Sequence, residues 1–365
     1  MNHFRKALST TNIMSPQTKN LALIYKKHPT GVPVPGEHLV VEDVDFDLSA
    51  PAPKGGLVLE HLYASFDPYM RGRMRSPEIK TYFPPFELNK PMVSHGIARV
   101  LKSDAEGYHE GDFIAGPIPI AQYSTRVIEP NTHIRKVDTV SGAPDVRDNI
   151  GALGMPGLTA YASLYEIGKP KKGETIFISS AAGAVGQIVG QITKHEGLKV
   201  IGSVSSDDKL NLILNMLSFD GGFNYKKEKS SEALKRLAPD GIDIYYENVG
   251  GEQLEAALAN MNDFGRIVAS GMISQYSLPP EKQYGVKNLI SIVIKRLTMR
   301  GFIVTDPDIG PKWSGEHQKN LTQWLKDGKF RTLTSETVGM EKAPQAFVGM
   351  LNGENFGKAV LKIKE

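Results

Sequence analysis

Alternating apolar and polar positions, interrupted by glycine and proline, characterise the first 140 residues of the chain. The pattern predicts strands at residues 20–25, 56–64, 96–103 and 111–116, separated by short turns. Evenly spaced short strands with turn residues between them are typical of an all-β unit. We therefore expect residues 21–150 to form a barrel-like β domain.

From about residue 150 the pattern changes to an alternation of helices and strands. It predicts helices at residues 154–167, 187–195, 207–217 and 252–261, and strands at residues 175–180, 199–204, 242–249, 265–270 and 297–304. Such alternation is the signature of a parallel sheet covered by helices. Helices at 317–327 and 343–351 and a strand at 357–363 follow. This tail is too short to be a domain, so we expect it to pack on the β domain or on the cleft.

A turn of small residues joins the strand at 175–180 to the helix that follows it. Its sequence is Ala181-Ala182-Gly183-Ala184-Val185-Gly186. Gly183 would let the backbone approach a pyrophosphate, Gly186 would let the helix pack tightly on the strand, and Ala181 stands where the fingerprint often has its first glycine. The free N–H groups and the dipole at the start of the helix would hold the phosphates. Small residues also form ordinary tight turns, but the flanking strand and helix favour a dinucleotide site in a doubly wound sheet.

The end of the second parallel strand distinguishes between NAD and NADP. NAD sites usually carry an acidic residue there, about 20 residues after the glycines, whereas this strand ends in Val204-Ser205-Ser206. Lys209 follows on the first turn of the next helix, and a hydroxyl with a cation suits a 2′-phosphate. Asp207 and Asp208 come after the strand and are expected to be the N-cap and first-turn acids of that helix and to face solvent. The sequence therefore predicts NADPH or NADP as the cofactor. The alternative is that Lys209 is an ordinary solvated helix residue.

Composition narrows the function classes. The chain has 365 residues, a net charge of +3 and no cysteine. We expect no nucleic-acid partner, because no basic block is interleaved with aromatic residues. We also expect no membrane span, because no apolar run approaches the roughly 20 residues that a bilayer requires. The cysteine count excludes disulfides and every thiolate metal site.

Residues 1–20 contain Arg5, Lys6 and Lys19, several hydroxyl residues and no acidic residue. We interpret them as a disordered N-terminal tail of a cytoplasmic protein. The composition is also faintly similar to a mitochondrial transit peptide, which keeps a mitochondrial location open as the alternative.

Several further motifs, together with the small-residue turn, resemble the medium-chain dehydrogenase/reductase superfamily. Within it they look like the zinc-independent branch of NADPH-dependent alkenal and prostaglandin (leukotriene) reductases, which includes the plant double-bond reductases. The resemblance extends from about residue 21 to the end of the chain. The motifs are Asp67-Pro68-Tyr69-Met70-Arg71-Gly72-Arg73-Met74, Tyr82-Phe83-Pro84-Pro85-Phe86, Gly154-Met155-Pro156-Gly157-Leu158-Thr159-Ala160-Tyr161, Ala181 to Gly186, Phe223-Asn224-Tyr225, Asn248-Val249-Gly250-Gly251, Gly271-Met272-Ile273-Ser274-Gln275-Tyr276 and Gly353-Glu354-Asn355-Phe356-Gly357-Lys358.

The resemblance implies an α/β protein with two domains and a homodimeric assembly. A GroES-like β-barrel catalytic domain would comprise residues 21–150 and 311–365. A Rossmann domain with a doubly wound parallel sheet would comprise residues 151–310 and bind NADP.

The resemblance also implies roles for individual residues. At the cofactor, Ala182, Gly183, Ala184 and Val185 would meet the pyrophosphate, Ser205, Lys209 and Tyr225 would hold the 2′-phosphate end, Asn248 and Asn355 would bind along the cofactor, and Met155 and Thr159 would lie near the nicotinamide. At the substrate, Tyr69 and Tyr82 would line the pocket and Tyr276 would be the catalytic residue at the carbonyl.

The implied activity is NADPH-dependent reduction of the carbon–carbon double bond of a small α,β-unsaturated aldehyde or ketone. Two segments depart from the family pattern: Ser94-His95-Gly96 replaces a glycine-rich run, and Pro117 to Ile120 stand where an aromatic residue is usual. These departures keep an NADPH-dependent quinone reductase open as an alternative. A low-turnover NADPH-binding protein with a structural or RNA-binding role is an alternative of another class, which the small net charge disfavours. His95 invites a zinc interpretation, but without cysteine a structural or pocket-lining role is favoured.

Overall fold

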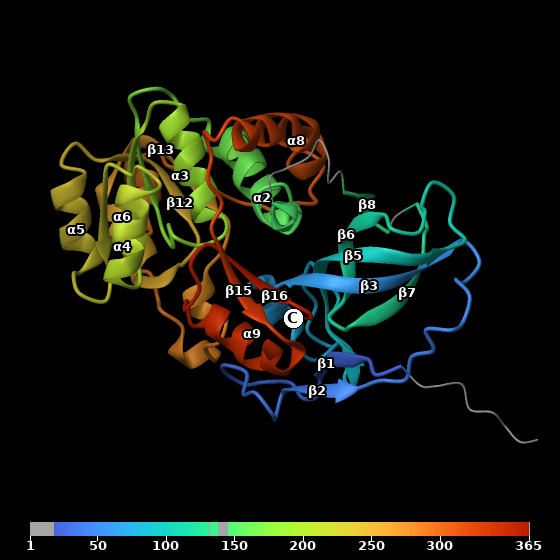
Figure 1. The fold of residues 1–365 in the computed structure, drawn as a ribbon. Helices are drawn as coiled ribbons and strands as arrows, with labels where there is room; N and C mark the ends of the chain where they lie inside the picture. The colour runs from blue at the N-terminus through green and yellow to red at the C-terminus, as the bar shows by residue number, and fades with distance from the viewer. Residues whose placement is uncertain (1–17, 131, 138–144, 365) are drawn as a thin grey trace, which may run out of the picture.

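The computed structural model describes residues 18–130, 132–137 and 145–364, and they build two β-containing bodies with the C-terminal segment between them (Figure 1). Most of the predicted tail, residues 1–17, lies outside the described residues. Residues 18–20 belong to the fold, because the Thr18 N–H donates to the Phe46 carbonyl and Asn20 is buried. The prediction that the tail extends to residue 20 is therefore corrected for residues 18–20.

The first body contains mainly antiparallel strands. A seven-stranded sheet has the order β15-β16-β3-β5-β6-β8, with β7 beside β3, and a three-stranded sheet has the order β2-β1-β4. A short helix, α1 (Tyr69–Arg73), follows β3, and α9 (Ala343–Leu351) precedes β16. The strands are β1 Leu21–Tyr25, β2 Leu39–Asp43, β3 Gly56–Ser65, β4 Lys90–Pro91, β5 Val93–Ser103, β6 Phe113–Pro119, β7 Tyr123–Val127, β8 Arg135–Lys136, β15 Thr334–Val338 and β16 Lys358–Lys362.

The second body is a six-stranded parallel sheet in the order β11-β10-β9-β12-β13-β14. This order is that of a doubly wound sheet, and it confirms the predicted α/β fold class. The strands are β9 Thr175–Ile178, β10 Lys199–Val204, β11 Gly221–Asn224, β12 Ile242–Glu247, β13 Met261–Ala269 and β14 Thr298–Gly301. The helices are α2 Met155–Ser163, α3 Gly186–His195, α4 Asp207–Asn215, α5 Ser230–Leu237, α6 Gly251–Asn260, α7 Ile290–Ile294 and α8 Gly310–Lys326.

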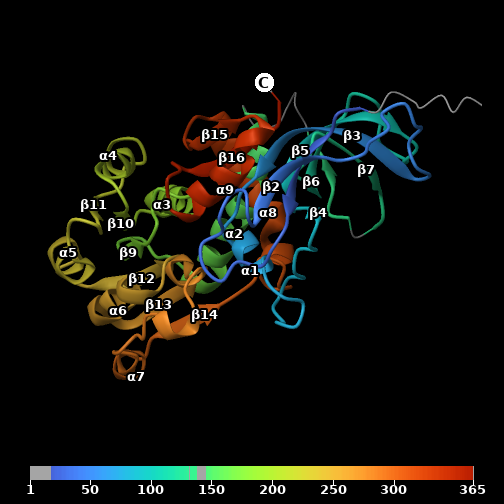
Figure 2. The same ribbon diagram turned by 90° about the horizontal axis from the view of Figure 1, so that it is seen from below.

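Both faces of the parallel sheet are buried, which explains why its strands are nearly continuous apolar runs. Along β9, Ile176 and Ile178 face one core, which α2, α3 and α8 also line, whereas Phe177 faces the opposite core under α5 and α6. Successive side chains of a strand point to opposite faces, so one strand supplies both cores. Figure 2 shows the helices on the two sides of this sheet.

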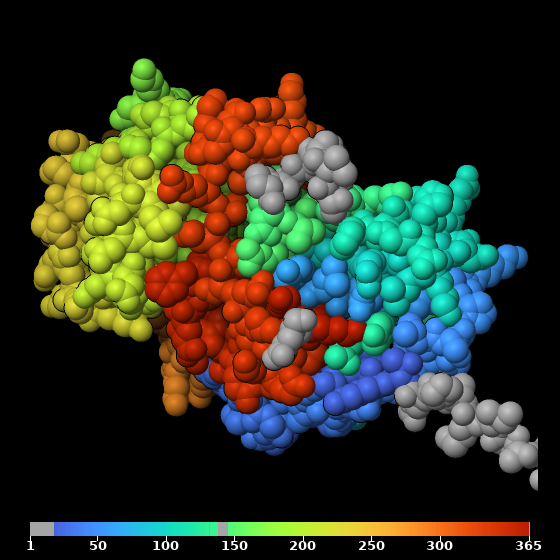
Figure 3. All heavy atoms as spheres, viewed as in Figure 1, coloured from blue at the N-terminus to red at the C-terminus, as the bar shows by residue number. Residues whose placement is uncertain are grey.

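The C-terminal part returns to the first body in two steps. Helix α8 packs on α2 and shares the core of the parallel sheet. The chain rejoins the first sheet only at β15, which pairs with β16 in parallel. In Figure 3 this segment, in red, lies between the two bodies. The division into domains at residues 150 and 311 stays a prediction, and packing alone would group α8 with the parallel sheet.

Candidate active site

The small-residue turn between β9 and α3 has little room for side chains. A Cβ added at Gly186 would lie 2.4 Å from the Ser180 carbonyl oxygen, and one at Gly183 would lie 3.2 Å from the same atom. Helix α3 therefore begins directly against the end of β9, as the sequence predicts. The four predicted pyrophosphate contacts therefore lie in one turn directly before a helix: Ala182, Gly183, Ala184 and Val185.

The C-terminal segment crosses this turn. The Gly357 N–H donates to the Ala182 carbonyl at 2.7 Å, and Gly183 and Gly357 form an isolated β-bridge. Gly357 has a φ of 62°, and a Cβ there would lie 1.9 Å from the Leu333 carbonyl oxygen, so only glycine fits. The Asn355 side chain donates to the Gly357 carbonyl at 2.7 Å. Asn355 is thus brought beside the turn, although it is distant in sequence.

Ser205 and Lys209 lie together after β10, as predicted. The Lys209 ammonium donates to the Gly353 carbonyl at 2.6 Å and to Ser205 Oγ at 3.3 Å. Lys209 is 7% exposed, and burial lowers the pKa of its ammonium. Within the described residues it forms no ion pair with a carboxylate, and its hydrogen bonds go to these two uncharged oxygens. Tyr225 is 42% exposed, and its N–H donates to the Val204 carbonyl at the end of the neighbouring strand.

The two acids after β10 both stand in the first turn of α4 and are exposed, as expected. Ser206 is the N-cap of this helix, so the expectation that one of the two acids caps it is wrong. The Asp207 carboxylate accepts from Asn224 Nδ2 at 2.9 Å and pairs with Lys227. Its charge is therefore compensated on the outer side of the strand ends.

A polar network that the sequence analysis missed joins the ends of β9 and β12. These strands flank the point where the strand order reverses, which is where open α/β sheets bind ligands. Glu247 Oε1 accepts from Ser179 Oγ at 3.1 Å, from the Tyr245 hydroxyl at 2.8 Å and from the N–H groups of Val249 and Gly250. The Asn248 side chain donates to the Ser179 carbonyl at 2.8 Å. Glu247 is fully buried, its Oε2 has no hydrogen-bond partner among the described residues, and burial raises the pKa of this carboxyl.

Three tyrosines were predicted on the substrate side. Tyr276 ends a short turn after β13, and its hydroxyl accepts the Met272 N–H at 3.1 Å. Tyr82 is 59% exposed, and its pKa is raised by partial burial and then by the neighbouring Tyr276. Tyr69 begins α1 and lies 5.2 Å from Phe83, whose ring is also 5.0 Å from that of Tyr82. These residues of the first body and Tyr276 of the second therefore approach one another.

The two residues expected near the nicotinamide contact each other at the start of α2. Thr159 Oγ1 lies 3.5 Å from the sulfur of Met155. Thr159 is 9% exposed, and its carbonyl accepts Ser163 Oγ at 2.8 Å and the Tyr246 hydroxyl at 3.4 Å. In the described part of the chain, no hydrogen bond joins either residue to the small-residue turn between β9 and α3. Their cofactor contacts stay a prediction.

His95 lies in β5 opposite Pro117 of β6. Its Nδ1 is buried and has no hydrogen-bond partner among the described residues, and burial lowers the pKa of the imidazole. Across residues 18–130, 132–137 and 145–364, no group of three or more metal-ligating side chains is close enough to hold an ion. A structural or pocket-lining role for His95 stays a prediction.

A buried ion pair fixes the entrance to α1. Lys358 Nζ lies 3.2 Å from Asp67 Oδ1 and donates to the Phe66 and Ala359 carbonyls at 2.5 and 3.0 Å. Both charged side chains are less than 5% exposed. The pair ties β16 to the segment that carries Tyr69. A lysine directly before the apolar run Ala359-Val360-Leu361 is the sequence signal for it.

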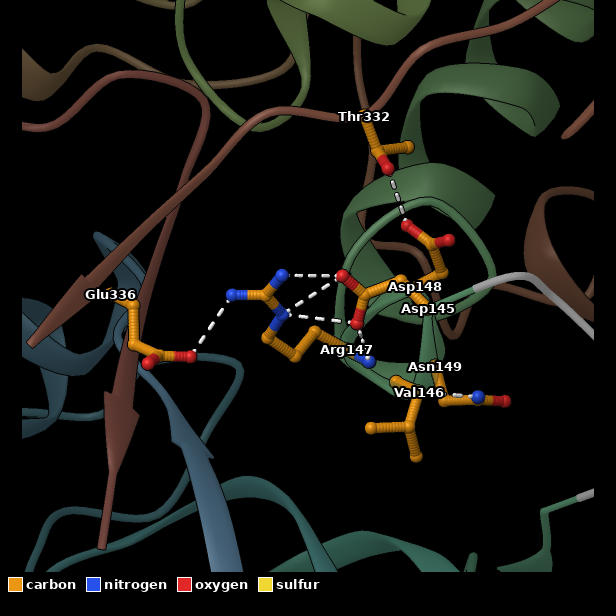
Figure 4. Close-up of polar contacts among 7 residues, drawn as sticks. All are labelled: Asp145, Val146, Arg147, Asp148, Asn149, Thr332 and Glu336. Carbon is orange, nitrogen blue, oxygen red and sulfur yellow. Dashed lines mark hydrogen bonds and ion pairs between the residues drawn. The ribbon is translucent and has the colours of Figure 1, made fainter. Parts of the chain in front are cut away.

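The junction between the two bodies is polar (Figure 4). Arg147 forms ion pairs with Asp145 and with Glu336 of β15. Asp148 is 4% exposed and accepts the Thr332 hydroxyl at 2.6 Å. The 3₁₀ turn Val146–Ile150 is thereby attached to the C-terminal segment that crosses the small-residue turn.

Comparison with known proteins identifies the chain. A family model described as the N-terminal domain of oxidoreductase matches residues 22–137, and one described as zinc-binding dehydrogenase matches residues 184–319. The NADP-dependent oxidoreductase RED1 of Cochliobolus heterostrophus is 51% identical over 95% of this chain and 98% of its own. The chain belongs to the medium-chain dehydrogenase/reductase family.

Other members of this medium-chain family agree in sequence and structure. An NADP(+)-dependent 2-alkenal reductase of Nicotiana tabacum is 41% identical over 96% of this chain and 99% of its own. The crystal structure of CurA from Vibrio vulnificus in complex with NADPH superimposes with a TM-score of 0.85 at 33% identity, and covers 94% of this chain and 99% of that one. The architecture of a GroES-like domain and a Rossmann domain is therefore confirmed.

Proposed function

We propose that this protein is an NADPH-dependent reductase that saturates the carbon–carbon double bond of small α,β-unsaturated aldehydes or ketones. The observation that carries the proposal is the placement of Tyr276 at the carboxyl end of the parallel sheet, opposite the aromatic residues Tyr69, Tyr82 and Phe83 of the first body. The similarity to a tobacco 2-alkenal reductase supports the substrate class.

The residues present fit NADPH. Lys209 is a buried cation without a carboxylate partner in the described residues, and Gly183 presents bare backbone in the turn before α3 because it has no side chain. When bound, the nicotinamide supplies a hydride. We infer that Ala182 to Val185 hold the pyrophosphate, Ser205, Lys209 and Tyr225 hold the 2′-phosphate, and Asn248, Asn355, Met155 and Thr159 contact the remainder of the cofactor.

Tyr276 would act on the substrate oxygen. Addition of hydride at the β-carbon forms a C–H bond and moves the electron pair of the double bond toward the carbonyl oxygen, and the α-carbon then takes a proton from solvent. A donor at that oxygen stabilises the developing charge. Because the Tyr276 hydroxyl accepts the Met272 N–H, its own proton is free to be donated to the substrate. Burial raises the pKa of Tyr276, so the phenol is neutral at physiological pH.

Tyr276→Phe tests this role, because it keeps the ring and removes only the hydroxyl. We expect kcat and kcat/KM for an enone to fall together by about 10²-fold or more, while NADPH affinity is unchanged. The assay is NADPH consumption with a panel of 2-alkenals, enones and quinones. Unchanged enone turnover with hydride transfer shown to be rate-limiting would exclude Tyr276 as the donor. Turnover of quinones alone would favour a quinone reductase, and cofactor binding without any turnover would favour a structural or RNA-binding role.

We also propose that the protein forms a homodimer through the β14 edge. β14 is the last strand of its sheet, so one side of it is unpaired. Four large apolar side chains nearby are more than 60% exposed: Phe264, Ile290, Val293 and Ile294. An unpaired edge beside exposed apolar residues favours pairing with a second copy. Light scattering should give the dimer mass for the native chain and the monomer mass for Val293→Glu; a monomeric native chain would refute the proposal.

A cytoplasmic location is proposed from the absence of cysteine, which fits a reducing compartment. In the part of the chain that the structure describes, no helix is long and apolar enough to cross a membrane. Fractionation of the source cells would test the location, with recovery in mitochondria as the contradicting result.

A further inference from the structure

The lysine after Tyr225 lies beside the 2′-phosphate residues, although no role was predicted for it. β10 and β11 are parallel neighbours, and Val204 pairs with Asn224 at their carboxyl ends. The Tyr225 N–H donates to the Val204 carbonyl at 3.1 Å, which extends this pairing by one residue. The two segments that follow these strand ends, which begin at Ser205 and at Tyr225, therefore start side by side.

The turn that carries Lys226 has a defined geometry. The Lys226 N–H donates to Asn224 Oδ1 at 3.1 Å, and Asn224 Nδ2 donates to Asp207. Lys227 pairs with that same Asp207 carboxylate. Asp207, which would repel a phosphate, is thus neutralised by Lys227. Lys226 is exposed and forms no ion pair within the described residues.

One lysine is a weak counterpart for the 2′-phosphate. The phosphate carries about −1.5 to −2 charges at neutral pH. The Lys209 ammonium already donates to the Gly353 carbonyl and to Ser205 Oγ, and it lies 5.4 Å from the Phe356 ring. Lys226 is close enough to lower the pKa of Lys209, after the larger effect of burial, whereas Glu354 raises it. Lys226 and Glu354 therefore both lie close enough to Lys209 to influence its charge.

We propose that Lys226 is a second cation of the adenosine 2′-phosphate site and contributes to the selection of NADPH over NADH. The inference rests on the proposed binding of the 2′-phosphate by Lys209. Lys226 is exposed whereas Lys209 is buried, and the two are close enough to influence each other, so a phosphate held by Lys209 would also be attracted by the charge of Lys226. The phosphate replaces water around an exposed side chain, so Lys226 contributes less than Lys209 and its contribution is sensitive to salt.

The test is the dissociation constant of NADPH and of NADH, measured by fluorescence titration on the purified full chain. Lys226→Ala should raise the NADPH constant about two- to fivefold at low ionic strength and leave the NADH constant unchanged. The difference should shrink at high ionic strength, and Lys226→Arg should restore NADPH binding.

Lys235→Ala is the matched control, because it removes the same charge from an exposed position on α5. α5 runs back from the carboxyl edge of the sheet, so its last turn lies far from the 2′-phosphate residues. An equal effect of Lys226→Ala and Lys235→Ala, or an equal loss of NADPH and NADH affinity, would refute the role of Lys226.

Lys209→Ala separates this inference from the proposed function. Selective loss of NADPH in Lys209→Ala together with an unchanged Lys226→Ala would refute the second cation alone. Equal loss of both cofactors in a folded Lys209→Ala protein would instead refute the proposed 2′-phosphate site itself.

Discussion

Asp148 gives the protein a specific dependence of stability on pH. Its side chain is 4% exposed in the turn that joins the two bodies, and it accepts a hydrogen bond from the Thr332 hydroxyl (Figure 4). Burial raises the pKa of this carboxyl to about 6, the neighbouring Asp145 adds to the increase, and the Thr332 hydrogen bond and Arg147 oppose it. At neutral pH, folding therefore transfers a carboxylate out of water with incomplete compensation.

The size of the effect follows from the change in pKa. The ordinary value is 3.8 and the folded value is about 6. A difference of about two units corresponds to about 3 kcal/mol of unfolding free energy. Because the folded state binds the proton more tightly than the unfolded state, this stabilisation is complete below pH ~4 and is lost as the pH rises through about 6. Asp148→Asn keeps an oxygen acceptor for Thr332 and has no proton to lose.

The assay is urea unfolding of native and Asp148→Asn protein between pH 4 and 8. The variant should gain about 2–3 kcal/mol relative to the native protein across this range, with most of the gain between pH 4 and 7. Thr332→Val, which removes the opposing hydrogen bond, should raise the pKa of Asp148 further, so the variant should lose more stability than the native protein and lose it up to a higher pH. Parallel stability curves for native protein and Asp148→Asn would refute the reasoning.

Three further outcomes are expected. Lys209→Ala should weaken NADPH by about tenfold or more and NADH little, measured by titration, because a charge-assisted contact contributes about 1.5–3 kcal/mol; equal losses would contradict it. Glu247→Gln should lower the unfolding free energy by about 1–3 kcal/mol, since it buries an unpaired amide donor. It should lower the affinities for NADPH and for NADH equally, because Glu247 lies away from the 2′-phosphate residues. A loss of affinity for NADPH alone would argue against this placement. Elemental analysis of tag-free protein should find no stoichiometric zinc, because relatives' sites use thiolates and this chain has no cysteine.

Elements with a strong local pattern were predictable from the sequence. The strands β9, β10 and β12, the helices α3 and α6, and the turn at Gly183 and Gly186 lie close to their predicted positions. Each depends on interactions among neighbouring residues, such as burial on both faces of a strand or the absence of side chains in a turn. The contact of Ser205 with Lys209 is also local, because Ser205 directly precedes the N-cap Ser206 of α4 and Lys209 stands in the first turn of that helix.

Other elements were missed because their sequences are short or polar. β11 begins with two glycines, and α5 carries only a narrow apolar stripe around Ala233 and Leu234. α8 begins at Gly310 rather than at residue 317, because Pro311 fits the first turn of a helix, where no N–H bond is needed. In these cases burial against the sheet, and not local propensity, decides the structure.

The sequence by itself determined the fold class, the position of the small-residue turn and the absence of thiolate chemistry. Only the tertiary structure placed the Gly353 carbonyl on Lys209 and Gly357 on Ala182. Lys209 and Gly353 are separated by 144 residues, and no periodicity or motif links them. The physical reason is that such contacts form where strand ends and the returning C-terminal segment meet. Their partners are chosen by the packing of the two bodies and not by the residues adjacent in the chain.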